Sequence, residues 1–270
     1  MAFLWALVEM VRKPNPAGVR RAQYAAIAGL AFVAASWVLG GYYYVSVYGA
    51  SVKPLIKEGP APWAHLIFME TKEHVFLFLP FIGGAAAAIA FTYGGRLSED
   101  SSARKGFLAL TGLSVLMVLG VGMMGFIVST GYRDSLEAMH LLTVPLALIG
   151  LAAAATAPLH AEVPKPAFSE RIPLWGVYAA AIFAMVLVTA LTIGSELNAG
   201  LKGWLAASFG HHWVGKGVLA TVSFGVIVGG AMLLRRKRST RVYRGALLTF
   251  ASAFLLGAII LAFYAYEYLY

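Results

Sequence analysis

Residues 70–93 read Glu-Thr-Lys-Glu-His-Val-Phe-Leu-Phe-Leu-Pro-Phe-Ile-Gly-Gly-Ala-Ala-Ala-Ala-Ile-Ala-Phe-Thr-Tyr. A polar start with two glutamates and His74 leads into an apolar run of about 20 residues, the length that a helix needs to cross a ~30 Å hydrocarbon core. Lipid offers no hydrogen-bond partner to an unpaired backbone group, and the apolar residues do not alternate as they do in barrel strands. The stretch therefore predicts a transmembrane helix with a polar cluster at its first turn.

Similar apolar runs recur along the whole chain. Of its 270 residues, 60% are hydrophobic and 12% are charged, which is about half the charged fraction of a soluble domain. The runs predict an all-α, polytopic membrane protein with seven transmembrane helices. We expect these helices at 22–49, 72–95, 106–131, 137–158, 173–197, 212–234 and 245–268. Residues 1–21 are expected to form an interfacial segment, because the apolar stretch at 1–10 is too short to span a bilayer.

The basic residues predict the orientation of the chain. Fifteen of the 21 lysines and arginines fall before the first predicted helix or in every second connection, including the linker at 159–172. By the positive-inside rule, these segments and the N-terminus are cytoplasmic, and the C-terminus lies outside the plasma membrane. This distribution accounts for the net charge of +9, so no nucleic-acid partner is expected.

The predicted outer connections, 50–71 and 198–211, are longer than a turn requires and mix aromatic with charged residues, as short amphipathic helices do. They also give the chain two similar parts. Residues 22–158 would form a four-helix bundle, and residues 173–270 a related three-helix repeat. The similarity of the two parts also fits the ordinary recurrence of helix–loop–helix units.

Three histidines, His74, His140 and His212, fall at the starts of predicted helices, within about one helical turn of the same depth near the outer face. Two imidazoles on facing helices at equal depth are the ligands of a b-type haem, and His74 with His140 is the pair that we expect. Such a chain would be an electron-transfer subunit that exchanges electrons with quinol or a partner subunit, within a quinol-linked oxidoreductase. The absence of cysteine excludes iron–sulfur ligation and covalent haem attachment. Each histidine alone also fits an interfacial side chain that binds lipid headgroups.

The carboxylates support a second hypothesis, a metal-handling site for copper, iron or zinc. Glu70 precedes His74 by four residues and Glu137 precedes His140 by three, so each pair shares one helix face. The second spacing is the Glu-x-x-His of dinuclear sites in four-helix bundles. Together with His212, these residues offer a mixed oxygen and nitrogen ligand set, although the complete dinuclear set is not present in the sequence.

Lys216 is expected to belong to the same site. It lies one turn after His212 and between two glycines, and small residues usually mark the packed face of a membrane helix. A buried ammonium needs an acidic partner, and Glu196, Glu137 or a haem propionate would serve. The alternative is a lysine that snorkels outward to the headgroups.

Two further patterns concern helix packing. Pro80 lies six residues after His74, and it is expected to kink its helix because proline cannot donate a backbone hydrogen bond. Gly225 and Gly229 form a small-residue motif with three residues between them. This motif predicts a close approach of another helix.

The runs His74-Val-Phe-Leu-Phe-Leu-Pro-Phe-Ile-Gly83-Gly84 and His140-Leu-Leu-Thr-Val-Pro-Leu-Ala-Leu-Ile-Gly150 resemble stretches of small four-helix b-type cytochromes and of the copper-resistance D family of membrane proteins. The first resemblance implies haem ligation by histidines on different helices. The second implies passage of copper, although the tryptophan often found before the glycines is missing here.

A third hypothesis is a cofactor-free subunit of a respiratory complex, which is structural or binds a quinone headgroup at the histidines. All three hypotheses place the chain in a lipid bilayer beside other membrane or extracytoplasmic subunits, because little of the chain extends beyond the predicted spans. Only the first makes the chain part of an enzyme.

Overall fold

The computed structural model describes residues 1–11, 15–136, 172–234 and 242–270. These residues form helices and contain no strand. Six helical segments are long and apolar enough to cross a membrane: Pro16–Glu58, Ala64–Ser98, Ser101–Leu136, Leu174–Leu197, His212–Leu233 and Val242–Leu269. An all-α protein with several membrane spans is therefore confirmed. The predicted helix at 137–158 lies outside the described residues, so the expected total of seven stays a prediction.

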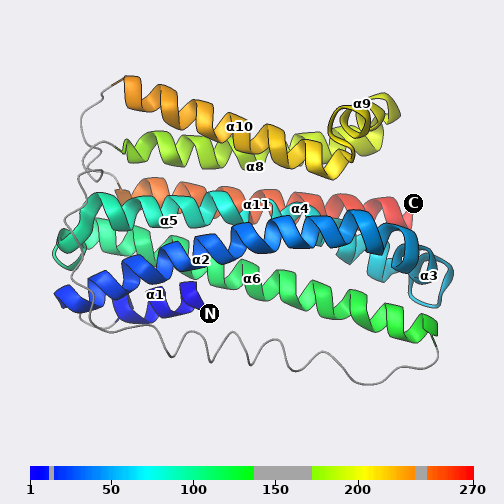
Figure 1. The fold of residues 1–270 in the computed structure, drawn as a ribbon, viewed down its shortest axis with the longest axis horizontal. Helices are drawn as coiled ribbons and strands as arrows, with labels where there is room; N and C mark the ends of the chain where they lie inside the picture. The colour runs from blue at the N-terminus through cyan, green and yellow to red at the C-terminus, as the bar shows by residue number, and fades with distance from the viewer. Residues whose placement is uncertain (12–14, 137–171, 235–241) are drawn as a thin grey trace.

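The long helices lie side by side along one axis (Figure 1). Four of them run in one direction: α2 (Pro16–Tyr43), α6 (Ser101–Leu136), α8 (Leu174–Leu197) and α11 (Val242–Leu269). Three run in the opposite direction: α4 (Glu70–Phe76), α5 (Leu79–Tyr93) and α10 (His212–Leu233). α3 (Lys53–Glu58), α9 (Ala199–Phe209) and the C-terminus lie together at one end of the bundle, which we call the α9 end.

Both predicted outer connections fold into short helical segments at the α9 end. The first contains two π-helical stretches, η1 (Tyr44–Val52) and η2 (Ala64–Met69), on either side of α3. The second is α9, whose first turn is capped by the side chain of Asn198. At the opposite end, α5 and α6 are joined by the short 3₁₀ helix η3 (Gly94–Ser98).

α1 (Ala2–Val11) folds back along α2 and packs against both α2 and α6. Phe3 is buried in this contact, and a Cβ atom at Gly29 of α2 would lie 3.0 Å from its ring. Arg21 donates two hydrogen bonds to the carboxylate of Glu9, at 2.7 and 3.0 Å. The segment expected to lie in the membrane interface is therefore held against the bundle by apolar packing and by an ion pair.

The second span is broken close to Pro80, where the sequence predicted a kink. Proline has no N–H to donate to the carbonyl of Phe76, and α4 ends at that residue. Leu77 and Phe78 then donate to the carbonyls of His74 and Val75, both at 3.1 Å, in a tighter turn before α5 begins. His74 is consequently in the last turn of a helix of only 7 residues.

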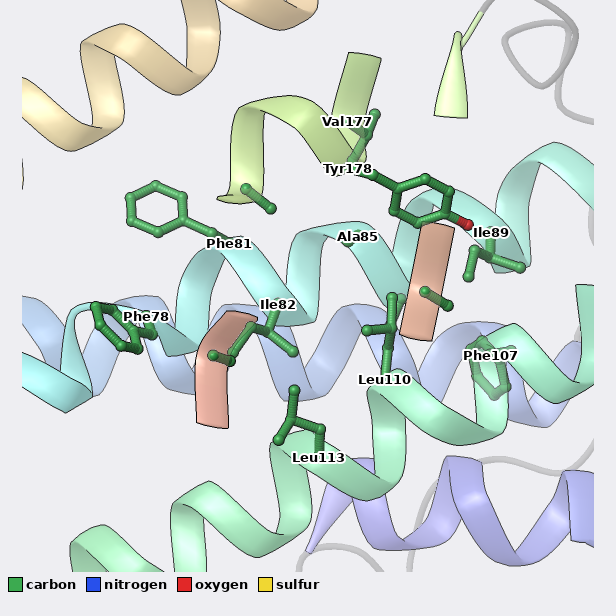
Figure 2. Close-up of a cluster of buried hydrophobic side chains, with 14 of the residues drawn as sticks. Phe78, Phe81, Ile82, Ala85, Ile89, Phe107, Leu110, Leu113, Val177 and Tyr178 are labelled. Atoms are coloured by element: carbon green, nitrogen blue, oxygen red, sulfur yellow. The ribbon is translucent and has the colours of Figure 1, made fainter. Parts of the chain in front are cut away.

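α5 is the central helix of the described bundle and packs against α2, α6 and α8. Its side chains Phe81 and Ile82 join Leu110 of α6 and Val177 of α8 in one cluster of buried apolar side chains (Figure 2). Alanines such as Ala85 lie between the large side chains of α5. Small residues let neighbouring helices approach closely in lipid, where packing replaces the hydrophobic effect as the main attraction between helices.

The spans also carry large apolar side chains on their outward faces. Phe32 of α2, Leu119 of α6, Val226 of α10 and Phe254 of α11 are all exposed. In water, such continuous apolar surfaces would drive aggregation. Contact between these faces and a lipid bilayer follows from the six spans and from these side chains together.

Candidate functional site: a buried polar cluster

Four ionisable side chains meet inside the bundle near the α9 end. Glu70, Glu73 and His74 come from α4, and Lys216 comes from α10. His74 and Lys216 are 0% exposed and Glu73 is 5% exposed. We refer to these four residues as the polar cluster. Burial of so much charge within a helical membrane protein is costly, and it is typical of a functional site.

The His74 ring is fixed by contacts at both nitrogens. Its Nδ1 lies 2.7 Å from the backbone carbonyl oxygen of Glu70, so Nδ1–H donates and Nε2 keeps its lone pair. The ammonium of Lys216 donates to Nε2 at 2.8 Å. The ring also stacks on Tyr264 of α11, with the ring centroids 5.8 Å apart. These contacts orient Nε2 toward the interior of the cluster.

The expected interior position of Lys216 is confirmed, although its partner differs from those that the sequence suggested. Lys216 binds His74, whereas Glu196 pairs with Lys202 of α9 at 2.5 Å. Close packing around the lysine explains its depth, because a Cβ atom at Gly217 would lie 2.8 Å from the ring of Trp37. Glu137, the other suggested partner, lies outside the described residues.

Glu73 has the least satisfied side chain in the cluster. No hydrogen bond of good geometry reaches either of its carboxylate oxygens among the residues that the structure describes, although the Tyr44 hydroxyl and the Glu70 carboxyl interact with this side chain. Its Oε1 lies 3.6 Å from Nε2 of His74. A buried carboxylate without such hydrogen bonds is strongly destabilised unless a cation or a proton compensates its charge. Glu73 therefore needs either a proton or a positively charged partner within this part of the bundle.

The backbone of Glu73 is held by α10. At the break in the span, the N–H of Leu77 donates to the carbonyl of His74 instead of that of Glu73. The carbonyl of Glu73 therefore accepts a hydrogen bond from the indole of Trp213 at 2.9 Å. Trp213 packs over Gly41 of α2, where a Cβ atom would meet its ring. The break in α4 and the glycine in α2 together let one tryptophan bridge three helices.

Glu70 connects the cluster to the surface of the α9 end. Its Oε1 lies 3.1 Å from Nε2 of His65 and 3.6 Å from the ammonium of Lys53. The other nitrogen of His65 is 2.9 Å from the hydroxyl of Tyr48. His65 is fully buried; the sequence places it in the outer connection at 50–71, from which we expected it to approach the site from above. The π-helical η2 turn brings residues five apart onto one face, which is the spacing between His65 and Glu70.

The other histidines of the predicted site are not joined to the polar cluster by any hydrogen bond in the described part of the chain. His212 begins α10 and stacks on His211, with the ring centroids 4.4 Å apart. Its Nδ1 is buried without a hydrogen-bond partner among the described residues. His140 lies outside the described residues, so the expected pair of His74 and His140 stays a prediction.

The cluster offers ligands for a metal ion. Glu70, Glu73 and His74 each present one ligand atom, and these atoms all lie within 4.8 Å of one another. Metal-binding histidines usually donate their second ring N–H to a carbonyl or carboxylate, which fixes the tautomer. His74 has this arrangement, because its Nδ1–H donates to the carbonyl of Glu70. Two carboxylates and an imidazole suit zinc, iron(II) or manganese, whereas copper(I) prefers sulfur.

His211 caps the first turn of α10 in a way that requires its neutral form. Its Nδ1 accepts a hydrogen bond from the backbone N–H of Trp213 at 3.2 Å. Burial, and secondarily the charge of Lys53, lowers the pKa of His211 below its ordinary value of 6.5. Since the pKa of His211 is lower in the folded state than in the unfolded state, the cap contributes its full stability above pH 6.5, the unfolded value. This stability is lost as the pH falls from there through the lower pKa of the folded state.

We therefore expect the first turn of α10 to loosen when the pH is lowered from about 7.5 to about 5.5. Amide hydrogen exchange at residues 213–215, corrected for its intrinsic pH dependence, measures this change. An asparagine cap does not titrate, so the same shift in pH should leave His211→Asn unchanged. Equal loosening in His211→Asn and in the wild-type protein would assign the effect to another group.

No protein-family model, curated protein or solved structure matches the chain. The resemblance of the two histidine-apolar-glycine runs to b-type cytochromes and to copper-resistance D proteins therefore stays a prediction.

Proposed function

We propose that the protein is a metal-handling membrane protein, which binds a divalent transition metal at the polar cluster. The observation that carries this proposal is the side chain of Glu73, which is buried with no hydrogen bond of good geometry to either oxygen among the described residues. One of its carboxylate oxygens lies within 4.8 Å of a ligand atom of Glu70 and of a ligand atom of His74. A divalent cation between these three side chains would compensate both carboxylates and use the lone pair of the imidazole.

Zinc and iron(II) are the preferred ions of the three that the sequence suggested. The cluster supplies hard oxygen and borderline nitrogen ligands, and the chain has no cysteine. Three protein ligands leave at least one coordination position for water or for another ligand, as in sites that exchange what they bind. The distribution of basic residues favours an outer location for the α9 end. A cluster near that face would receive or deliver its metal there.

The test is a metal titration of the purified protein in detergent. After treatment with a chelator and its removal, the wild-type protein should bind about one equivalent of zinc, measured by equilibrium dialysis and elemental analysis. The double variant His211→Asn/His212→Gln should keep that equivalent, because neither histidine shares a hydrogen bond with the cluster. Binding of much less than one equivalent of both zinc and iron(II) by the wild-type protein would overturn the proposal.

The b-type haem hypothesis makes a different demand on His74. A haem iron would need open space at Nε2 for the whole macrocycle, whereas the ammonium of Lys216 lies 2.8 Å from this atom and Glu73 lies 3.6 Å from it. A single metal ion needs far less rearrangement. Purified protein with a low-spin b-type spectrum on reduction, lost in His74→Ala, would favour electron transfer with quinol or a partner subunit instead.

A further inference from the structure

Resting on the metal site proposed above, we propose that Lys216 competes with the metal for His74, so that the lysine ammonium and the metal exclude each other at Nε2. Lys216 would then be a tethered cation that weakens metal binding and makes it readily reversible. The competing ammonium comes from α10, whereas the three proposed metal ligands come from α4.

The chemistry of imidazole makes the two partners exclusive. A neutral imidazole has one lone pair, here on Nε2, and its other nitrogen is committed to the carbonyl of Glu70. The ammonium of Lys216 already donates to that lone pair at 2.8 Å. A metal ion needs the same lone pair. The ammonium has to leave before the His74–metal bond can form.

The charges of the cluster lead to the same result. Ammonium groups already act on both carboxylates: Lys53 lies 3.6 Å from Glu70, and the charges of Lys216 and Lys72 act on Glu73. Lys216, bound to His74, therefore already places one positive charge inside the cluster. A divalent ion bound beside the ammonium would add two positive charges at short range in a buried site, where repulsion is poorly screened.

A displaced Lys216 has an acidic group toward which it can move. The charge of Glu196 acts on Lys216, and Glu196 Oε1 is buried with no hydrogen-bond partner among the described residues. The four-carbon stem of lysine gives the ammonium freedom to swing between partners without a backbone change. Because the ammonium is tethered, it stays at high effective concentration beside His74 and returns when the metal leaves.

The experiment compares zinc affinity in variants of Lys216, using competition with a chromophoric chelator. Lys216→Met and Lys216→Gln remove the charge, and each should bind zinc at least about tenfold more tightly than the wild-type protein. Glutamine retains a neutral donor for Nε2, so it serves if methionine disturbs folding. Lys216→Arg keeps the cation and should bind no more tightly than wild type. Lys57→Met removes an exposed lysine at the same end and is the matched control, with unchanged affinity.

The outcomes separate this inference from the proposed function. If the wild-type protein binds zinc and a folded Lys216→Met or Lys216→Gln binds it equally or less tightly, the competition is refuted and the metal site stands. If the wild-type protein binds neither zinc nor iron(II), the metal site itself is refuted, and the competition with it. Circular dichroism and gel filtration of each variant establish that its fold is intact.

Discussion

Glutamine in place of Glu73 is expected to weaken zinc binding by at least about 100-fold. Loss of a residue that merely supports a metal ligand costs roughly 10- to 100-fold, and loss of a ligand costs more. Glu73 is expected to be a ligand because its carboxylate is buried without a hydrogen bond of good geometry among the described residues. Glutamine has nearly the same shape and removes only the charge, so the fold should be retained. The dissociation constant from the chelator competition measures the effect.

Glu58→Gln is the matched control for this prediction. Glu58 is the last residue of α3, at the same end of the bundle, and it is exposed. The substitution changes the net charge of the α9 end by the same amount without touching the polar cluster. Zinc affinity should be unchanged in this variant. Equal affinity in Glu73→Gln and Glu58→Gln would show that Glu73 is not a ligand.

Leucine in place of Gly245 is expected to lower the free energy of unfolding by about 3 kcal/mol, the upper end of the usual cost of overpacking. Gly245 is in the first turns of α11, and a Cβ atom there would overlap the ring of Tyr178. Tyr178 is buried in the main core cluster, so it has little room to move. The larger side chain should therefore separate α8 from α11. Unfolding in a graded detergent mixture, followed by circular dichroism, measures the loss.

Gly225→Leu provides the control, because the chemical change and the helical setting are the same. A Cβ atom at Gly225 of α10 would meet no described residue within 4 Å. This substitution should change the free energy of unfolding by less than about 1 kcal/mol. A similar loss in both variants would mean that lower glycine content, rather than the contact with Tyr178, determines the result.

The helices could be predicted well where the apolar runs have clear polar or proline boundaries. α8 was expected at 173–197 and is observed at Leu174–Leu197, since Pro173 precedes it and Asn198 follows it. The start of α2 was predicted less well, at residue 22 instead of Pro16. Arg20 and Arg21 interrupt the apolar run near its start, and the first turn is set by capping from Asn15 and by the fixed backbone angle of proline. Hydropathy does not detect either effect.

The site could be predicted only where its residues share one helix. The spacing of Glu70 and His74 indicated a common face, and the two glycines beside Lys216 indicated burial. Which atom Lys216 would contact depends on how α10 lies against α4, and spacing along the chain has no information about that. The same limit explains why the sequence did not show which glycines pack against another helix. A Cβ atom at Gly225 or Gly229 would meet no described residue within 4 Å, whereas the space beside Gly245 is occupied by the ring of Tyr178 from α8.

The bond between His74 and Lys216 joins residues that are 142 positions apart, and this separation has a consequence for biogenesis. A ribosome delivers α4 to the membrane well before α10 has been made. Until then, Glu73 and His74 lack Lys216, and an incompletely balanced charge is expensive in the hydrocarbon layer. We therefore expect the first turn of α4 to stay at the headgroup region at that stage. Its packing into the bundle would follow the insertion of α10, which supplies Lys216 to the polar cluster.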